Sequence, residues 1–376
     1  MTLQRAVEVT TNRKSAGFRI VLTVVLLPFF LFPAELLVKY IRTPGPARQD
    51  TIPSSYMPIR LRPNFRGPIG DMQEVITNRY GFRGEPDFPR RRPDGEYRIL
   101  ALGDSIGFGF GVQPGETYSR QAEALLTGGP GRIRIINAAG QGYSPSMYLA
   151  YLQAEGFDLE PNLILVQVEP SNDVTDEALL RVVDGGDQGL EVRGGRYCVT
   201  WDGNLLGSFT LGPYFYERTY LYTMLTRRLL ETLGRLFPRH SALSTPRNLY
   251  YHMGFDRFLF TSARLESGWT RSQAALSQIR KIASRNGSRF VLLLTPTLYA
   301  FHEKRTLNGF GNLLIDRMTD WARQQSIDTI DPRAALAGKG GTALFTDFAH
   351  YTPKGHRVLG REIARYLEDH ELKIEN

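Results

Sequence analysis

Cysteine, metal-ligand patterns and phosphate-binding loops are scarce in this sequence of 376 residues. Cys198 is the single cysteine, which excludes a disulfide within the chain but leaves the compartment open. No segment has the GxGxxG pattern or the Gly-Lys-Ser/Thr ending of a phosphate-binding loop. We therefore expect no cofactor. We also expect no metal site, because four histidines have no partner at metal-ligand spacing: His240, His252, His302 and His370.

Negative charge is also in the minority, with 38 acidic against 46 basic residues and a net charge of +8. Such a balance suits nucleic acid, an anionic membrane surface or an acidic polymer. The sequence contains no recognisable nucleic-acid module, so we expect no nucleic-acid partner. An arginine-rich background explains the charge equally well. The hydrophobic content of 42% is ordinary for a globular protein.

Long apolar runs are rare as well. The uncharged run from Ile20 to Ala34 is 15 residues long, short of the roughly 20 that cross a bilayer. Because Arg19 and Lys39 can extend their charges toward the interfaces, residues 18–41 are long enough. No small-residue cleavage site follows, which favours an uncleaved transmembrane anchor over a signal peptide. Residues 1–17 then form a cytoplasmic tail.

Residues 42–96 are rich in proline and arginine, a composition that predicts an extended spacer and lead-in. Within this stretch, residues 78–84 read Asn-Arg-Tyr-Gly-Phe-Arg-Gly. The pattern suggests a pair of turns, and the sequence assigns it no chemical role.

The most informative stretch is residues 98–112. An apolar run of strand length, Ile99 to Leu102, breaks into Gly103-Asp104-Ser105 and is followed by further glycines. A serine at the end of a buried strand lies at the edge where open α/β sheets bind ligands. A phosphate loop or a purely structural glycine turn are the alternatives. A nucleophilic serine is favoured if the chain supplies a histidine and a carboxylate.

The C-terminal part supplies both. Asp347 precedes His350 by three residues, just ahead of a predicted helix at residues 355–367. That offset lets the carboxylate meet one imidazole nitrogen while the other faces the serine. We therefore predict acyl transfer in which Ser105 attacks an ester, His350 moves the proton and Asp347 orients the imidazole.

Four short blocks, in order, resemble those of the SGNH (GDSL-type) esterases and acetyltransferases. They are Gly103-Asp104-Ser105, Asn137-Ala-Ala-Gly-Gln-Gly142, Pro170-Ser-Asn172-Asp173 and Asp347-Phe-Ala-His350. The resemblance implies a three-layer α/β/α sandwich around a parallel sheet of the flavodoxin-like kind. It also implies an oxyanion hole formed by the N–H groups of Ser105 and Gly142 and the side chain of Asn172.

The blocks depart from the family pattern at three places. Ile106 replaces a leucine, and Pro170 stands where glycine is common, which affects how the asparagine loop is held. Gly140 and Gly142 compete for the role in the second block. The element at residues 78–84 is similar to one that membrane-anchored bacterial members carry before their serine block.

Strands and helices alternate through residues 97–370, which predicts a parallel sheet covered on both faces. The expected strands are residues 97–102, 133–137, 163–168, 289–294 and 329–331. The expected helices are residues 118–126, 145–155, 270–286, 307–325 and 355–367.

Residues 174–265 interrupt this alternation and are predicted as an insertion. Its first part suggests a hairpin with strands at residues 190–192 and 197–201. Leucines at i+4 spacing then predict an amphipathic helix at residues 214–237. The arginines and aromatic residues of this insertion agree with two alternatives. One is a lid over the site, and the other is a surface that faces polysaccharide or membrane.

From these observations we expect an esterase or O-acyltransferase that acts on ester groups, most simply acetyl, of an envelope or exported polysaccharide. A membrane acyl donor is a possible partner. The family resemblance implies a single-pass inner-membrane protein with its catalytic domain in the periplasm. The alternative is a binding or scaffold component of an export complex that kept the fold and lost turnover.

Overall fold

The computed structural model describes residues 51–52, 54, 56–57, 60–69, 72–126, 132–182, 199–201, 262–303 and 305–370. The predicted tail and anchor, most of the insertion and its amphipathic helix lie outside these residues. Within them, no helix is both long enough and apolar enough to cross a bilayer.

The centre of the fold is a five-stranded sheet with the order β11-β10-β7-β5-β6, in which every neighbouring pair is parallel. The strands are β5 (Glu96–Leu102), β6 (Arg132–Asn137), β7 (Leu163–Val168), β10 (Arg289–Leu294) and β11 (Asp328–Ile330). Their sequences are almost continuously apolar because helices cover both faces of the sheet.

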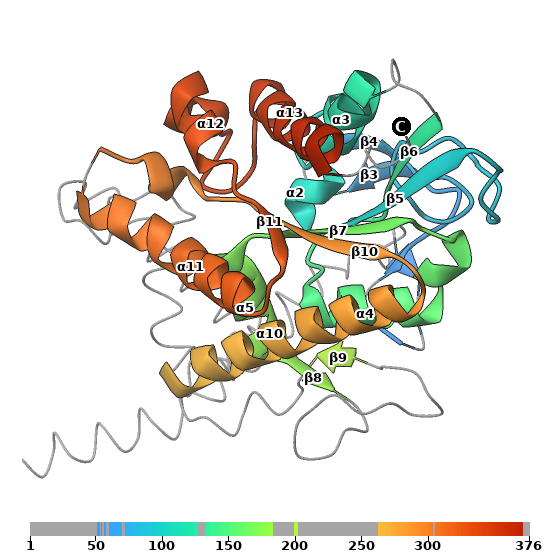
Figure 1. Cartoon of the computed structure of the whole chain (residues 1–376). Coiled ribbons are helices and arrows are strands. Elements are labelled where there is room, and N and C mark those ends of the chain that lie inside the picture. The colour runs from blue at the N-terminus through green and yellow to red at the C-terminus, as the bar shows by residue number, and fades with distance from the viewer. Residues whose placement is uncertain are drawn as a thin grey trace, which may run out of the picture. The chain divides into compact units, whose positions relative to one another are not determined.

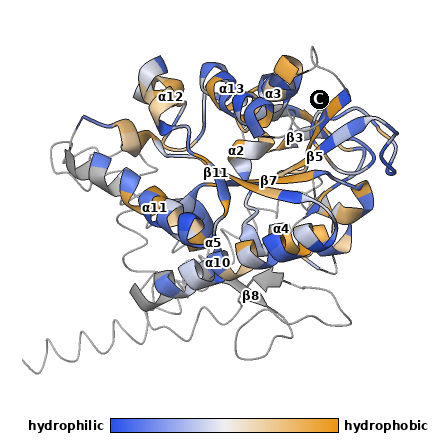
Figure 2. Ribbon diagram, viewed as in Figure 1, coloured by the Kyte–Doolittle hydropathy of each residue, from blue (hydrophilic) through white to orange (hydrophobic). Residues whose placement is uncertain are grey.

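Alternate residues of each strand enter two separate cores. On β5, Leu100 and Leu102 pack in one core and Ile99 and Ala101 in the other. Figure 1 shows the corresponding layers, with α3, α12 and α13 on one side of the sheet and α4, α10 and α11 on the other. Figure 2 shows the apolar strands enclosed between amphipathic helices. This is the three-layer α/β/α arrangement expected from the sequence.

The helices have the following bounds: α2 (Ser105–Phe108), α3 (Tyr118–Leu126), α4 (Pro145–Ala154), α5 (Pro170–Leu179), α10 (Ser262–Arg285), α11 (Arg305–Gln324), α12 (Arg333–Lys339) and α13 (Pro353–His370). Short 3-10 turns occur at Pro114–Glu116, Gly156–Leu159, Leu298–Phe301 and Gly341–Leu344. The five predicted strands and five predicted helices are all present with small shifts at their ends. The exception is α10, which starts eight residues earlier than the predicted 270. The sequence did not reveal α5, α12 or the single turn of α2.

The strand order determines where a ligand binds. Numbered along the chain, the five strands lie in the order 2-1-3-4-5, which is the flavodoxin-like arrangement. Its topological switch point lies between the first and third strands, here β5 and β7. Ser105 directly follows β5, and Asn172 lies just beyond β7. The predicted site therefore lies at the position where this class of sheet binds ligands.

The start of the predicted insertion differs from expectation. Residues 174–179 continue α5, which begins at Pro170, so they belong to the main fold. A short antiparallel hairpin follows, with β8 (Leu180–Val182) paired to β9 (Val199–Trp201). The second strand agrees with the predicted hairpin, whereas the first lies ten residues earlier than predicted.

The described part of residues 51–92 is not an extended spacer. It contains β1 (Thr51–Ile52), β2 (Arg60–Leu61) and a hairpin of β3 (Arg66–Ile69) with β4 (Met72–Ile76). Four large side chains of this part join the core that contains Leu100 and Leu102, called the main core below. They are Tyr56, Met57, Phe82 and Phe88. The many prolines of this stretch did not prevent short strands and turns from forming and packing against the rest of the fold.

Candidate active site

Three predicted side chains come together in one hydrogen-bonded chain. Nε2 of His350 lies 2.8 Å from Oγ of Ser105, and Nδ1 of His350 lies 2.7 Å from Oδ2 of Asp347. The serine and histidine are 245 positions apart in sequence. This is the order of nucleophile, base and orienting carboxylate that activates a serine.

The histidine segment is held largely by its own backbone. Oδ1 of Asp347 accepts hydrogen bonds from the N–H groups of Ala349 and His350, at 2.9 and 2.8 Å. The N–H of Thr346 donates to the carbonyl of His350, which closes a tight turn. Burial raises the pKa of Asp347, but the hydrogen bonds and opposite charge from His350 outweigh it and hold the pKa below its usual value. Asp347 therefore stays ionised beside the imidazole.

The serine begins α2, a single helical turn. Asp104 caps this turn by accepting from the N–H of Ile106 at 2.8 Å. Gly109 ends it in the left-handed conformation, with φ of 80°, which favours glycine. Burial raises the pKa of the Asp104 carboxyl, so this group serves as a cap rather than as an exposed base.

Gln167, the second-last residue of β7, binds the same turn. Its Oε1 accepts from the N–H groups of Asp104 and Gly107, at 3.1 and 3.2 Å. Its Nε2 donates to Oγ1 of Thr295 at 2.9 Å, so the amide cannot rotate away. A Cβ on Gly103 would lie 2.5 Å from the same Oε1, which explains the glycine of the first block. The one available signal in the sequence was a lone polar residue in an otherwise apolar strand.

The geometry separates the two glycines of the second block. The N–H of Gly140 donates to the carbonyl of Gly103 at 3.1 Å, and a Cβ there would meet the ring of Tyr143 at 2.5 Å. Gly140 is thus engaged in packing and backbone bonding. Gly142, with φ of 71°, has a conformation that favours glycine and is the better candidate oxyanion donor.

Asn172 lies next to the serine turn, but its amide is engaged. Nδ2 donates to Oδ2 of Asp176 at 3.1 Å and to Oδ2 of Asp104 at 3.4 Å. A role in the oxyanion hole requires this amide to turn from the carboxyl groups toward the substrate. The structure therefore brings Asn172 to the site without presenting it as a ready donor.

Glu169 explains how the asparagine loop is held where Pro170 replaces glycine. Its carboxyl group accepts from the N–H groups of Ser171 and Asn172, at 3.1 and 2.9 Å, and so caps α5. In return, Asp173 accepts from the N–H of Glu169 at 2.8 Å. Proline suits the first turn of a helix, where its missing N–H costs nothing. Asp173 therefore has a structural role in this loop.

Burial raises the pKa of each carboxyl group around Asn172, and their mutual repulsion adds to the effect for most of them. The groups are Asp104, Glu169 (to about 7), Asp173, Asp176 and Glu177. A protonated carboxyl is a weaker hydrogen-bond acceptor than a carboxylate. The two carboxyl groups that accept from the Asn172 amide, Asp176 and Asp104, are therefore harder to ionise than carboxyl groups in water. Among the described residues no group of three or more His, Cys, Asp or Glu could hold a metal ion.

His356 lies in the first turns of α13, where its side chain is fully buried. Its Nδ1 accepts from the N–H of Tyr118 at 3.2 Å. Burial, with smaller contributions from the charges of His350 and Arg83, lowers its pKa to about 3. His356 therefore remains neutral and links α13 to the start of α3.

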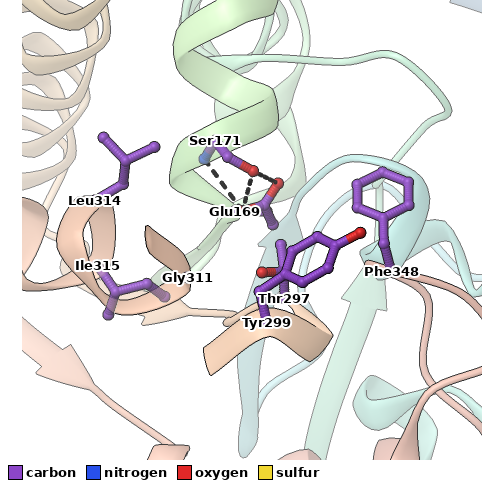
Figure 3. Close-up of a pocket in the computed structure, with 8 residues that line it drawn as sticks. All are labelled: Glu169, Ser171, Thr297, Tyr299, Gly311, Leu314, Ile315 and Phe348. Atoms are coloured by element: carbon purple, nitrogen blue, oxygen red, sulfur yellow. Dashed lines mark hydrogen bonds between the residues drawn. The ribbon is translucent and has the colours of Figure 1, made fainter. Parts of the chain in front are cut away.

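A small hollow lies between the segment that carries His350 and the segment that carries Asn172. Figure 3 shows Tyr299, Thr297 and Phe348 facing Glu169 and Ser171 across it, with Leu314 and Ile315 beyond. Open solvent included, it encloses about 300 Å³ outside the protein atoms. The hydroxyl of Tyr299 is buried and has no hydrogen-bond partner among the described residues, so a polar ligand atom would find a partner there.

No family model matches the sequence, and neither does any curated protein. Solved structures do. Axe2, an acetylxylan esterase from Geobacillus stearothermophilus, is 13% identical, with 72% of this chain and 93% of that chain covered and a TM-score of 0.40. A member of the lipolytic protein G-D-S-L family from Veillonella parvula is 12% identical, with 72% and 98% covered and a TM-score of 0.37.

These solved structures are G-D-S-L and esterase proteins, the group that the four sequence blocks resemble. At such identities and TM-scores, the interpretation of the site depends on its own geometry. In that geometry Ser105, His350 and Asp347 form one hydrogen-bonded series beside the switch point of the sheet.

Proposed function

We propose that this chain is a serine-dependent SGNH-type esterase or O-acyltransferase. The observation that carries the proposal is the continuous hydrogen-bonded series from Asp347 through His350 to Ser105. A buried or purely structural serine does not need an imidazole on its hydroxyl and an ionised carboxylate behind that imidazole.

In the first half-reaction, Oγ of Ser105 attacks the carbonyl carbon of the ester while Nε2 of His350 takes the hydroxyl proton. Asp347 keeps Nδ1 protonated and stabilises the imidazolium that forms. The tetrahedral intermediate then collapses. The bond to the alcohol oxygen breaks, the leaving alcohol takes the proton from Nε2, and the acyl group remains on Ser105.

In the second half-reaction, another nucleophile gives its proton to His350 and attacks the acyl-serine. If the nucleophile is water, the product is a carboxylic acid and the protein is an esterase. If it is a sugar hydroxyl, the product is a new ester and the protein is an O-acyltransferase. In both, His350 returns the proton to Ser105.

The developing oxyanion needs donors. We assign the N–H groups of Ser105 and Gly142 to this role, with Asn172 as a third donor once its amide leaves Asp176 and Asp104. Loss of one such donor typically lowers kcat by about 10²–10³.

The substrate and location belong to the proposal as well. The anchor at residues 18–41 would keep the catalytic domain at the outer face of an inner membrane, near a polysaccharide and a possible membrane acyl donor. Cell fractionation tests this part. Full-length protein should stay with the membrane after a carbonate wash, and a mature N-terminus near residue 35 would contradict an uncleaved anchor.

The chemical proposal is tested with p-nitrophenyl acetate and purified protein. We expect acyl-enzyme turnover by the wild type and a loss of about 10⁵–10⁶ in kcat for Ser105→Ala. Acetyl content of the envelope polysaccharide, measured by NMR in a Ser105→Ala strain, then separates the two activities. Less acetyl than wild type indicates a transferase, and more indicates an esterase. No turnover by the wild type on any ester, with no change in any glycan, would support the alternative of a scaffold that lost catalysis.

A further inference from the structure

We propose that Arg83 is a positioning residue that fixes the loop carrying the nucleophile. The inference rests on the proposed serine chemistry and adds a residue to it. Arg83 lies in the element at residues 78–84, for which sequence analysis indicated no chemical role. Its side chain is buried, with only 6% of the residue exposed.

The guanidinium of Arg83 binds backbone carbonyls just after Ser105. Nη1 donates to the carbonyls of Phe108 and Gly109, at 2.9 and 2.6 Å, and Nη2 donates to the carbonyl of Val112 at 2.7 Å. The carbonyls at the end of a helical turn have no partner within the helix, so an arginine satisfies them well. Figure 1 shows α2 on the same side of the sheet as β3 and β4, the hairpin that leads into this element.

Among the described residues no carboxylate forms an ion pair with Arg83, and burial lowers its pKa to about 10. A buried cation without an anion is costly, so strong alternative partners must stabilise it. The three carbonyls supply them, and the ring of Phe108 lies 5.1 Å from the guanidinium carbon. Interactions of this kind hold loop and arginine in one arrangement.

The rest of the element is shaped to deliver this side chain. Oδ1 of Asn78 accepts from the N–H groups of Tyr80 and Phe82, at 2.9 and 3.0 Å, which forms the turn. Gly84 has φ of 62°, and a Cβ there would lie 2.2 Å from Cβ of Pro114. Phe82 packs in the main core. The Asn…Gly-Phe-Arg-Gly pattern is therefore explained by the backbone conformation that places Arg83 against the carbonyls of the nucleophile loop.

The loop that Arg83 holds contacts the catalytic histidine. The ring of Phe110 lies 4.7 Å from the ring of His350, centroid to centroid. The N–H of Phe110 donates to the carbonyl of Ser105 at 3.0 Å. Since Arg83 binds carbonyls on both sides of Phe110, it fixes the position of the histidine ring relative to the serine.

A lysine at position 83 could not make the same hydrogen bonds to these carbonyls. The planar guanidinium reaches carbonyls three residues apart with two nitrogens, whereas an ammonium is one compact charge. Because a displacement of about 1 Å can cost about 10²-fold in rate, we expect kcat to fall about 10²-fold in Arg83→Met and about 10-fold in Arg83→Lys. KM should stay within about twofold, since these interactions do not touch substrate.

The experiment compares Arg83→Met and Arg83→Lys with Arg79→Met. Arg79 is a matched control because it lies in the same element, is exposed, and donates to the carbonyl of Phe88 rather than to the nucleophile loop. Thermal unfolding and circular dichroism identify folded variants. A fluorophosphonate probe then measures the reactivity of Ser105 apart from substrate binding. We expect kcat and labelling rate to fall together in both Arg83 variants and to stay at the wild-type level in Arg79→Met.

An unchanged kcat in folded Arg83→Met would overturn the proposal, and if that variant does not fold, an unchanged kcat in Arg83→Lys would do so. Hydrogen exchange separates this inference from the proposed function. The amides of Phe110 and Val112 should exchange at least about tenfold faster in Arg83→Lys, while amides of β5 stay protected. If wild-type protein hydrolyses no ester but the exchange result holds, the proposed function fails while the role of Arg83 in fixing the loop stands. Unchanged exchange overturns that role whatever the activity.

Discussion

The two segments that meet in the site depend on distant residues to different degrees. The histidine segment, residues 346–351, is organised mainly by its own backbone and by Asp347, three residues from His350. Its distant bonds come from the N–H of Leu298 to the carbonyl of Phe348 and from the hydroxyl of Tyr351 to the carbonyl of Pro296. The serine segment, residues 103–112, depends on distant residues: Gln167 holds its start and Arg83 its end. Asn137 adds a third distant bond by donating from Nδ2 to the carbonyl of Gly107 at 2.8 Å.

The difference shows where precision has to come from. An imidazole needs one orienting partner, which a short turn can supply. A nucleophile at the end of a strand must be placed against both the histidine and the oxyanion donors, which come from other strands. Such placement requires bonds across the sheet, and these bonds can be broken without touching the reacting atoms.

The largest expected effect comes from a substitution in the histidine segment, where the bonds around His350 are local. Asp347→Asn keeps an oxygen for the two backbone N–H groups but presents an amide to Nδ1, which forces the wrong imidazole tautomer. We expect kcat to fall about 10³–10⁴-fold with little change in the melting temperature. Steady-state kinetics on p-nitrophenyl acetate measure it. A loss that follows unfolding instead would show that Asp347 serves the turn and not the imidazole.

Removing the bonds of Gln167 to the serine segment should lower kcat less than Asp347→Asn does and should lower the free energy of unfolding more. Gln167→Met leaves two buried N–H groups without an acceptor, each worth about 1–3 kcal/mol. We expect kcat to fall about 10–10²-fold and the midpoint of urea unfolding to fall clearly. Thr295→Val is the control because it removes the anchor of Gln167 without touching the loop. Equal kcat values in wild type and folded Gln167→Met would contradict the hypothesis that Gln167 positions the serine segment.

The hydrogen bond from Tyr118 to His356, which links α3 to α13, is expected to depend on pH. The folded pKa of His356, about 3, lies below its ordinary 6.5, so between these values the unfolded chain binds more protons than the folded one. Stability from this group is complete above the ordinary value and is lost as pH falls. At about pH 5 the loss is roughly 2 kcal/mol.

Denaturant unfolding of wild type and His356→Gln from pH 7 to about pH 5 checks this prediction. The variant lacks the titration, so the difference in unfolding free energy between the two proteins should shrink by roughly 2 kcal/mol as pH falls. Glu85 and Glu169, whose pKa values burial raises to about 7, act in both proteins and cancel in the difference. A constant difference would show that the pKa of His356 is the same in the folded and the unfolded chain.

The smallest effect is expected in the hollow beside the histidine segment. Leu314 contributes to its apolar end, opposite Tyr299 and Phe348 (Figure 3). Leu314→Ala should raise activity on p-nitrophenyl butyrate relative to acetate by about 3–10-fold, because a few methylenes are worth about 1–3 kcal/mol at most. Leu313→Ala is the control, since Leu313 is exposed at 62%. An unchanged butyrate-to-acetate ratio would exclude the hollow as the acyl site.

The comparison of the two segments also explains what could be predicted from the sequence. The bonds around Asp347 and His350 are local, so their spacing alone predicted them. Strand–helix alternation likewise predicted the elements of the sheet, because each carries its own apolar pattern. Ser105 was found because small residues must surround it: a Cβ on Gly107 would lie 2.7 Å from Cβ of Ala139.

The contacts of Gln167 and Arg83 could not be predicted, because nothing in their local sequence says what they reach across 60 and 25 positions. The engagement of Asn172 by Asp176 is within reach of an i,i+4 rule, but only once residues 170–179 are known to form a helix. Low hydrophobicity and many prolines hid the packing of residues 56–92. A few large side chains, such as Tyr56 and Phe88, were enough to bury that segment.

That packing has a consequence for the time course of synthesis. Tyr56 and Arg60 bind Glu155, which follows them by 99 and 95 positions. The segment therefore leaves the ribosome long before its docking surface on α4 exists, and it must remain unpaired during that interval. Non-local pairing of this kind slows folding. The site itself waits longer still. His350 follows Ser105 by 245 positions, so the serine gains its imidazole partner only after almost the whole chain has been made.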